Sequence, residues 1–149
     1  MSDLDLWGKL DLNNEDNEEP FSILNKQVKV FEKKVNDVLF IRLLKINISD
    51  SKSKYSLSTN FEIVSPSLDN YSYTLFTVYS RAENDYPIGI ECNYLKDKKS
   101  MDDILKLDYE CNNKEEFIEA LRNVLQSEES KKIVRTLYHK VAYSSVSII

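Results

Sequence analysis

The sequence predicts an α+β fold: an N-terminal helix, an antiparallel meander sheet of four or five strands, and two C-terminal helices packed on one face. Near both ends of the chain, apolar residues recur every three to four positions, as on amphipathic helices. Between them, residues 38–94 alternate apolar and polar side chains, which is typical of half-buried strands. The connections are short, and short connections favour antiparallel neighbours. The 149 residues suffice for one core without disulfides or metal.

The first helix is expected over residues 21–34. Apolar side chains repeat at helical spacing from Phe21 to Phe31, while lysines occupy other positions. Pro20 precedes this pattern, and proline is tolerated in the first turn of a helix. We expect Asn36 and Asp37 to end this helix.

Four runs read as strands, over residues 38–48, 55–63, 71–80 and 86–94. The first begins apolar on both faces, which predicts a central strand. Pro87 predicts that the fourth starts at its own first residues or lies at an edge. A short fifth strand is expected over 107–111.

The third strand is predicted to separate its side chains cleanly between two faces. One face is expected to carry Tyr71, Tyr73, Leu75, Thr77 and Tyr79. The other is expected to carry Phe76 and Val78.

The C-terminal third predicts a helical turn over residues 101–105 and then two helices. Asn113 with Glu116 forms a capping-box pattern before the first helix, and Ser127 is placed to cap the second.

Charge divides the chain into an acidic tail and a near-neutral body. Residues 1–19 carry seven acids and one base, whereas the remaining residues carry 18 acids and 19 bases. We therefore expect a weakly ordered tail over 1–19, one α+β domain over 20–143, and a C-terminal tail over 144–149. A near-neutral body does not favour general nucleic-acid binding.

The compartment expected from the sequence is the cytoplasm. No run of about 20 apolar residues is present, and the first residues lack a basic region typical of a secretory signal. Two cysteines, Cys92 and Cys111, fit no disulfide framework and are read as reduced. Lysine outnumbers arginine by 16 to 4, which we interpret as the codon bias of an AT-rich genome.

Several kinds of catalytic chemistry lack their motifs. The two glycines, Gly8 and Gly89, are too far apart for a phosphate-binding loop or a nucleophile elbow. His139 with either cysteine is the one nucleophile pair available, and a buried structural cysteine is the favoured reading. We expect no catalytic residues, no cofactor and no metal site.

Arg42 interrupts an apolar strand. Its guanidinium is expected to pair with Glu62 or Glu91, or to reach solvent where the strand ends.

Two features of the sequence indicate binding. Leu4, Trp7 and Leu10 lie among acids, which is typical of a short segment that fills a hydrophobic groove, either on a partner or on its own domain. The tyrosines on the third strand suit a protein interface if that face is open, and are core if helices cover it.

The expected function is a small cytoplasmic protein-binding module without catalytic activity, such as a regulator, inhibitor or immunity-type partner. Its predicted partner-binding residues are Leu4, Trp7, Leu10, Tyr71, Tyr73 and Tyr79. The alternative is single-stranded nucleic-acid binding through an aromatic sheet face that includes Arg81. The partner is another protein; nucleic acid is disfavoured and no membrane association is expected.

Overall fold

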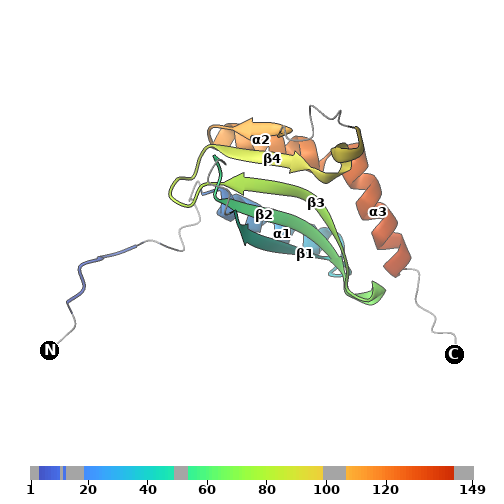
Figure 1. Cartoon of the computed structure of the whole chain (residues 1–149). Coiled ribbons are helices and arrows are strands. Elements are labelled where there is room, and N and C mark those ends of the chain that lie inside the picture. Colours follow the sequence, from blue (N-terminus) through green and yellow to red (C-terminus); the bar gives the residue numbers. More distant parts are fainter. Residues whose placement is uncertain (1–3, 11, 13–18, 49–53, 99–106, 143–149) are drawn as a thin grey trace.

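A computed structural model of the chain describes residues 4–10, 12, 19–48, 54–98 and 107–142 (Figure 1). It has an N-terminal helix, a five-stranded antiparallel sheet and two C-terminal helices, which confirms the predicted α+β architecture. The predicted helical turn over 101–105 and the predicted tail over 144–149 lie outside the described residues. In the part of the chain that is described, no helix is long and apolar enough to cross a membrane.

Helix α1 spans Pro20–Lys34, close to the predicted bounds. Proline stands at the start of the helix, where its missing N–H costs nothing. Asn36 and Asp37 then adopt left-handed backbone conformations, with φ of 52° and 58°, which a right-handed helix cannot continue through.

The sheet is a simple meander in which each strand pairs with the next along the chain. Its strands are β1 (Phe40–Asn47), β2 (Leu57–Ser65), β3 (Tyr71–Ser80), β4 (Ile88–Cys92) and β5 (Tyr109–Cys111). Short 3₁₀ helices follow β2 and β4, namely η1 (Pro66–Leu68) and η2 (Asn93–Lys98). Strand β4 begins directly after Pro87, which agrees with one of the two positions expected for that proline.

Strand β1 lies at one edge of the sheet, so the prediction of a central strand is wrong. The apolar residues on both of its faces suggested burial on both sides. Ile41 and Leu43 do pack against the core, but Phe40, Leu44 and Ile46 on the other face are 39%, 40% and 47% exposed. Among the described residues, helices cover only one side of the sheet and no strand lies beyond β1 (Figure 1).

A β-bulge in β3 divides the residues that the sequence assigned to one face. Phe61 of β2 pairs with Phe76, but Glu62 pairs with Thr74, so Leu75 is an extra residue in β3. Both Leu75 and Phe76 are buried beneath the helices. After Leu75, each side chain of β3 therefore lies on the face of the sheet opposite to the one predicted for it.

Helices α2 (Lys114–Leu125) and α3 (Glu128–Ala142) begin at the predicted caps. The side chain of Asn113 accepts a hydrogen bond from the N–H of Glu116 at 2.9 Å, and Ser127 Oγ accepts from the N–H of Ser130 at 3.1 Å. The core between helices and sheet includes Leu24, Ile63, Phe76 and Phe117, each at most 2% exposed.

Candidate protein-binding groove

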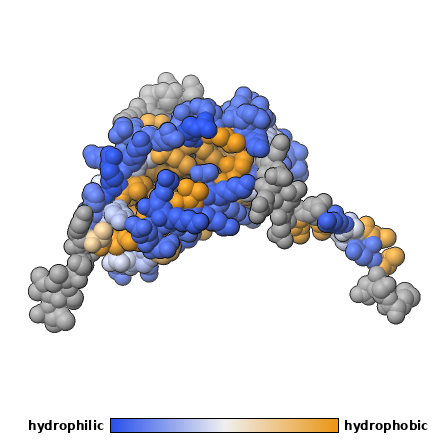
Figure 2. Space-filling view, turned by 180° about the vertical axis from the view of Figure 1, so that it is seen from behind, coloured by the Kyte–Doolittle hydropathy of each residue, from blue (hydrophilic) through white to orange (hydrophobic). Residues whose placement is uncertain are grey.

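An open cavity of about 920 Å³ lies on the helix side of the sheet. Helix α1 forms one wall, helices α2 and α3 form the other, and residues of β1, β2 and β3 form the floor. Figure 2 views this side and shows hydrophobic surface at the centre, bordered by hydrophilic surface. We call this cavity the helix groove.

The floor and inner walls of the helix groove are apolar. They comprise Ile23, Val30, Phe31, Ile41, Phe61, Ile63, Leu75, Ile118, Leu121, Leu125 and Val134. On the walls, Val30 is 45% exposed and Ile118 and Leu125 are partly exposed, whereas the floor residues Phe61, Ile63 and Leu75 are at most 2% exposed. The groove therefore presents open apolar surface mainly along its walls.

The charged residues that line the helix groove are all basic. They are Lys26, Lys34, Lys114, Arg122 and Lys131, and no described Asp or Glu lines it. Arg122 also pairs with Glu119 on its own helix, which offsets part of its charge. The rim is thus positively charged around an apolar floor.

The two facing helices carry matching patterns along the rim. On α1, Lys26 and Lys34 stand four residues either side of Val30. On α2, Lys114 and Arg122 stand four residues either side of Ile118. Residues four apart lie on the same face of a helix, so each wall presents a basic–apolar–basic stripe to the groove. Sequence reasoning missed this site, although the stripes were available as a signal.

A second, smaller groove of about 600 Å³ holds two of the predicted tyrosines. Tyr71 and Tyr73 form one side of it, and Ile133 and Leu137 of α3 form the other. Tyr71 is 48% exposed, whereas Tyr73 is half-buried against the core. Two of the three predicted tyrosines are therefore brought together, beside α3 rather than on an open sheet.

Tyr79 lies on the opposite face of the sheet, so the prediction that it shares a face with Tyr71 and Tyr73 is wrong. The extra residue Leu75 reverses the alternation, which places Phe76 and Val78 in the core and Tyr79 on the outer side. There its ring lies 6.2 Å from the ring of Tyr55, and burial raises its pKa.

On the uncovered face of the sheet, Arg42 makes the carboxylate contact expected for it. Its guanidinium donates to Glu62 Oε1 at 2.7 Å, and Thr74 Oγ1 donates to Glu62 Oε2 at 3.2 Å. The Glu62 side chain is 8% exposed, but that of Arg42 is 53% exposed. Both expectations for Arg42 are met, because its guanidinium pairs with a carboxylate and its side chain also reaches solvent.

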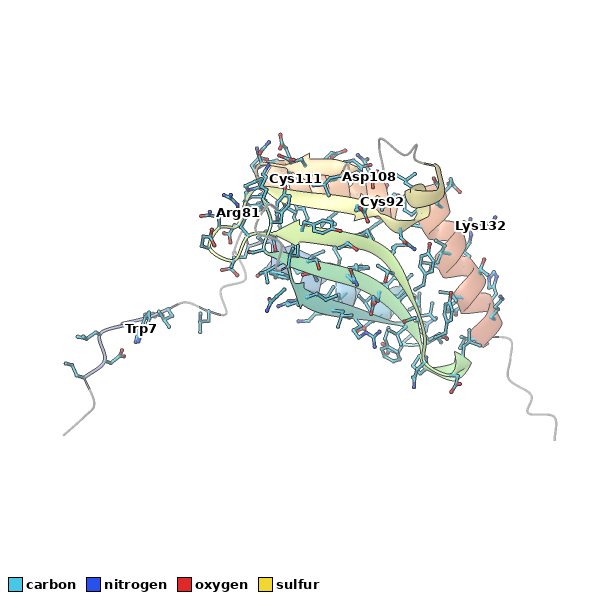
Figure 3. The ribbon with its side chains drawn as sticks, viewed as in Figure 1. Trp7, Arg81, Cys92, Asp108, Cys111 and Lys132 are labelled. Carbon is cyan, nitrogen blue, oxygen red and sulfur yellow. The ribbon has the colours of Figure 1, made fainter. Side chains whose placement is uncertain are left out.

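The cysteines are buried in the sheet, at 0% exposure for Cys92 and 2% for Cys111 (Figure 3). Burial, with smaller contributions from Glu116 and Glu110, raises the pKa of the Cys111 thiol to about 11. A thiol in this setting is protonated at neutral pH and is a weak nucleophile. Among the described residues, no three His, Cys, Asp or Glu side chains gather as metal ligands would.

The predicted partner-binding residues of the N-terminal segment are exposed. Trp7 is 80% exposed, Leu4 81% and Leu10 53%, and Figure 3 shows Trp7 away from the sheet and helices. The N–H of Trp7 donates to Asp5 Oδ1 at 2.9 Å, which forms a local turn. The structure thus shows this segment separate from both grooves.

No protein-family model, curated protein or solved structure matches this chain, so the functional argument depends on the geometry of the helix groove.

Proposed function

We propose that this chain is a protein-binding module without catalytic activity, acting as a small regulator, inhibitor or immunity-type partner. Its receptor surface is the helix groove, and its ligand is an acidic, leucine-rich segment of another protein. The observation that carries the proposal is the pair of basic–apolar–basic stripes that face each other across an apolar floor.

The composition of the groove supports this ligand. Amphipathic protein segments bind by laying an apolar face into a hydrophobic groove, and the lining of this groove is mainly apolar between basic residues. An apolar stripe on the ligand would bury against Val30, Ile118 and Leu125, which supplies affinity. Acidic residues flanking that stripe would meet the basic rim, which accelerates association and disfavours basic competitors.

The proposal is tested by photo-crosslinking in cells of the native host. A benzophenone amino acid replaces Gln27, which lines the groove, or Lys29, which lies on the same helix but does not line it. We expect the Gln27 position alone to form an adduct with another protein, and mass spectrometry to locate the adduct in an acidic, leucine-rich peptide.

A charge-reversed bait supplies the second arm of this experiment. Lys26→Glu with Lys131→Glu reverses two rim charges, and the adduct at position 27 is then expected to be lost. If position 27 captures no other protein, or if capture is indifferent to the rim charges, the proposed function is wrong.

Single-stranded nucleic-acid binding is supported less well. The second groove combines Tyr71 and Tyr73 with Lys132 and Lys140, which suits a stacked base and a phosphate. However, the bulge places Tyr79 on the other face, so the three rings do not form one platform. Salt-sensitive binding of a labelled oligonucleotide that is lost in Tyr71→Ala would favour this alternative.

A further inference from the structure

We propose that the helix groove also receives the chain's own N-terminal segment, residues 4–12, in a docked state that competes with an external ligand. This inference depends on the proposed function only in taking the groove as a binding surface. The structure shows the released state, in which segment and groove are both open (Figures 2 and 3).

The segment has the chemistry that the groove selects. Leu4, Leu6, Trp7, Leu10 and Leu12 are 53–83% exposed in the released state. In water, transfer of this much exposed apolar surface into an apolar site is favourable. The groove offers matching open surface at Val30, which is 45% exposed, and at Ile118 and Leu125, which are partly exposed.

The charges of the two parts are complementary. Residues 1–19 carry seven acids and one base, whereas the rest of the chain carries 18 acids and 19 bases. Of the described residues that line the groove, five are Lys or Arg and none is Asp or Glu. Within residues 4–12, Asp5 and Asp11 outweigh Lys9 by one charge, and the other five acids of residues 1–19 lie on either side of this segment. Charge complementarity therefore directs the acidic tail as a whole toward this rim.

The tether allows docking within one molecule. Seven residues separate Leu12 from Pro20, and seven extended residues span up to about 25 Å. Helix α1, the near wall of the groove, has 15 residues and is therefore about 22 Å long. Because a short tether gives an effective concentration on the order of millimolar, docking in the same chain is favoured over docking in a second copy.

Trp7 reports on this docking directly, because it is the single tryptophan of the chain. The experiment records Trp7 emission and acrylamide quenching in the full chain, over a range of protein concentrations, beside a free peptide of residues 1–19. We expect emission shifted to the blue and reduced quenching relative to the peptide, at all protein concentrations.

Three matched double variants locate the docking site. Lys26→Glu with Lys131→Glu is expected to return Trp7 to peptide-like emission, because it reverses rim charge. Lys29→Glu with Lys33→Glu makes the same change in charge at residues that do not line the groove, and is expected to leave the emission shifted. Lys132→Glu with Lys140→Glu changes the second groove and is also expected to have no effect.

Two further variants separate docking from misfolding. Val30→Asp places a negative charge in the groove at a position that is already 45% exposed, and is expected to release Trp7 with unchanged far-ultraviolet circular dichroism. Adding Asp5→Lys and Asp11→Lys to the rim double variant is expected to restore the blue shift, because the charges are then exchanged between segment and rim.

The inference is overturned by any of three results. Peptide-like emission of the wild-type chain would show that the segment does not dock, while the crosslinking result at position 27 would still decide the proposed function. A blue shift that grows with protein concentration would assign the segment to a second copy. Release by the Lys132 and Lys140 variant, but not by the rim variant, would assign it to the second groove.

Discussion

Burial determines what individual polar residues do in this protein. Glu62 is 6% exposed on a strand face that none of the described helices covers, and it accepts hydrogen bonds from Arg42 and Thr74. A carboxylate buried to this extent requires such partners, because an unpaired buried charge is costly. The sequence indicated that Arg42 required a partner or solvent, but not that Glu62 would be the buried member of the pair.

Cys111 is expected to make stability fall with pH in the alkaline range. Its pKa is raised from an ordinary value of 9.0 to about 11, mainly by burial. Between these values the folded chain keeps a proton that the unfolded chain releases. The free energy of unfolding therefore decreases as pH rises, by up to about 2–3 kcal/mol from this group.

Urea unfolding of the wild type and of Cys111→Ala, at several pH values from neutral to pH 11, measures this contribution. The variant is expected to lose less stability over the alkaline range. Burial also raises the pKa values of Tyr55, Tyr79 and Tyr109 in both proteins. Cys111 adds a smaller increase to the pKa values of Tyr55 and Tyr109, and this coupling belongs to the difference that the variant measures. Identical pH slopes would contradict the assignment to Cys111.

At the scale of elements, local signals set where helices begin, and neighbouring strands set where side chains face. The caps at Asn113 and Ser127 depend on residues three positions away, so they could be read from the sequence. The bulge at Leu75 depends on the register between β2 and β3, which the sequence of β3 does not contain. For this reason the positions of Tyr71 and Tyr79 were predicted wrongly relative to each other.

Removing the α2 cap is expected to destabilise the protein measurably. Asn113→Ala deletes the acceptor of the Glu116 N–H bond, which costs about 1 kcal/mol of unfolding free energy. Asn123→Ala makes the same change at an exposed position in the last turn of α2, where alanine's helix propensity leaves stability unchanged or slightly higher. Urea unfolding compares the two variants, and equal losses would show that the cap contributes nothing specific.

At the scale of the whole molecule, the one-sided arrangement of helices leaves β1 as an exposed edge. One N–H of that edge is covered, because the N–H of Ile41 donates to Glu32 Oε2 of α1 at 3.2 Å. By alternation, the N–H groups of Leu43 and Lys45 point the same way, away from β2. Strands β2, β3 and β4 are each paired on both sides.

Amide hydrogen exchange is expected to follow this topology. Interior strands should be the most protected, and Leu43 and Lys45 should exchange much faster than Ile41. A hydrogen bond to a carboxylate contributes about 1.5–3 kcal/mol, so Ile41 should be protected on the order of tenfold to a hundredfold. Glu32→Ala should remove that protection. Uniform exchange along β1 would contradict the edge assignment.

The sequence by itself determined the elements of this protein, their order and the antiparallel sheet. Those properties depend on periodicity, caps and short connections, which act between residues close together in the chain. It also identified the acidic segment around Trp7, but it left open whether that segment docks on its own domain.

Only the tertiary structure decided which of these surfaces form a site. The helix groove forms because α1 faces α2 over a floor of residues from three strands. These two helices are far apart in the sequence, since α2 begins 80 residues after α1 ends. Lys26 and Lys114 are ordinary surface lysines until packing places them on one rim. The edge position of β1 and the reversal at Leu75 likewise depend on what packs beside each strand, because neighbours in space determine exposure and register.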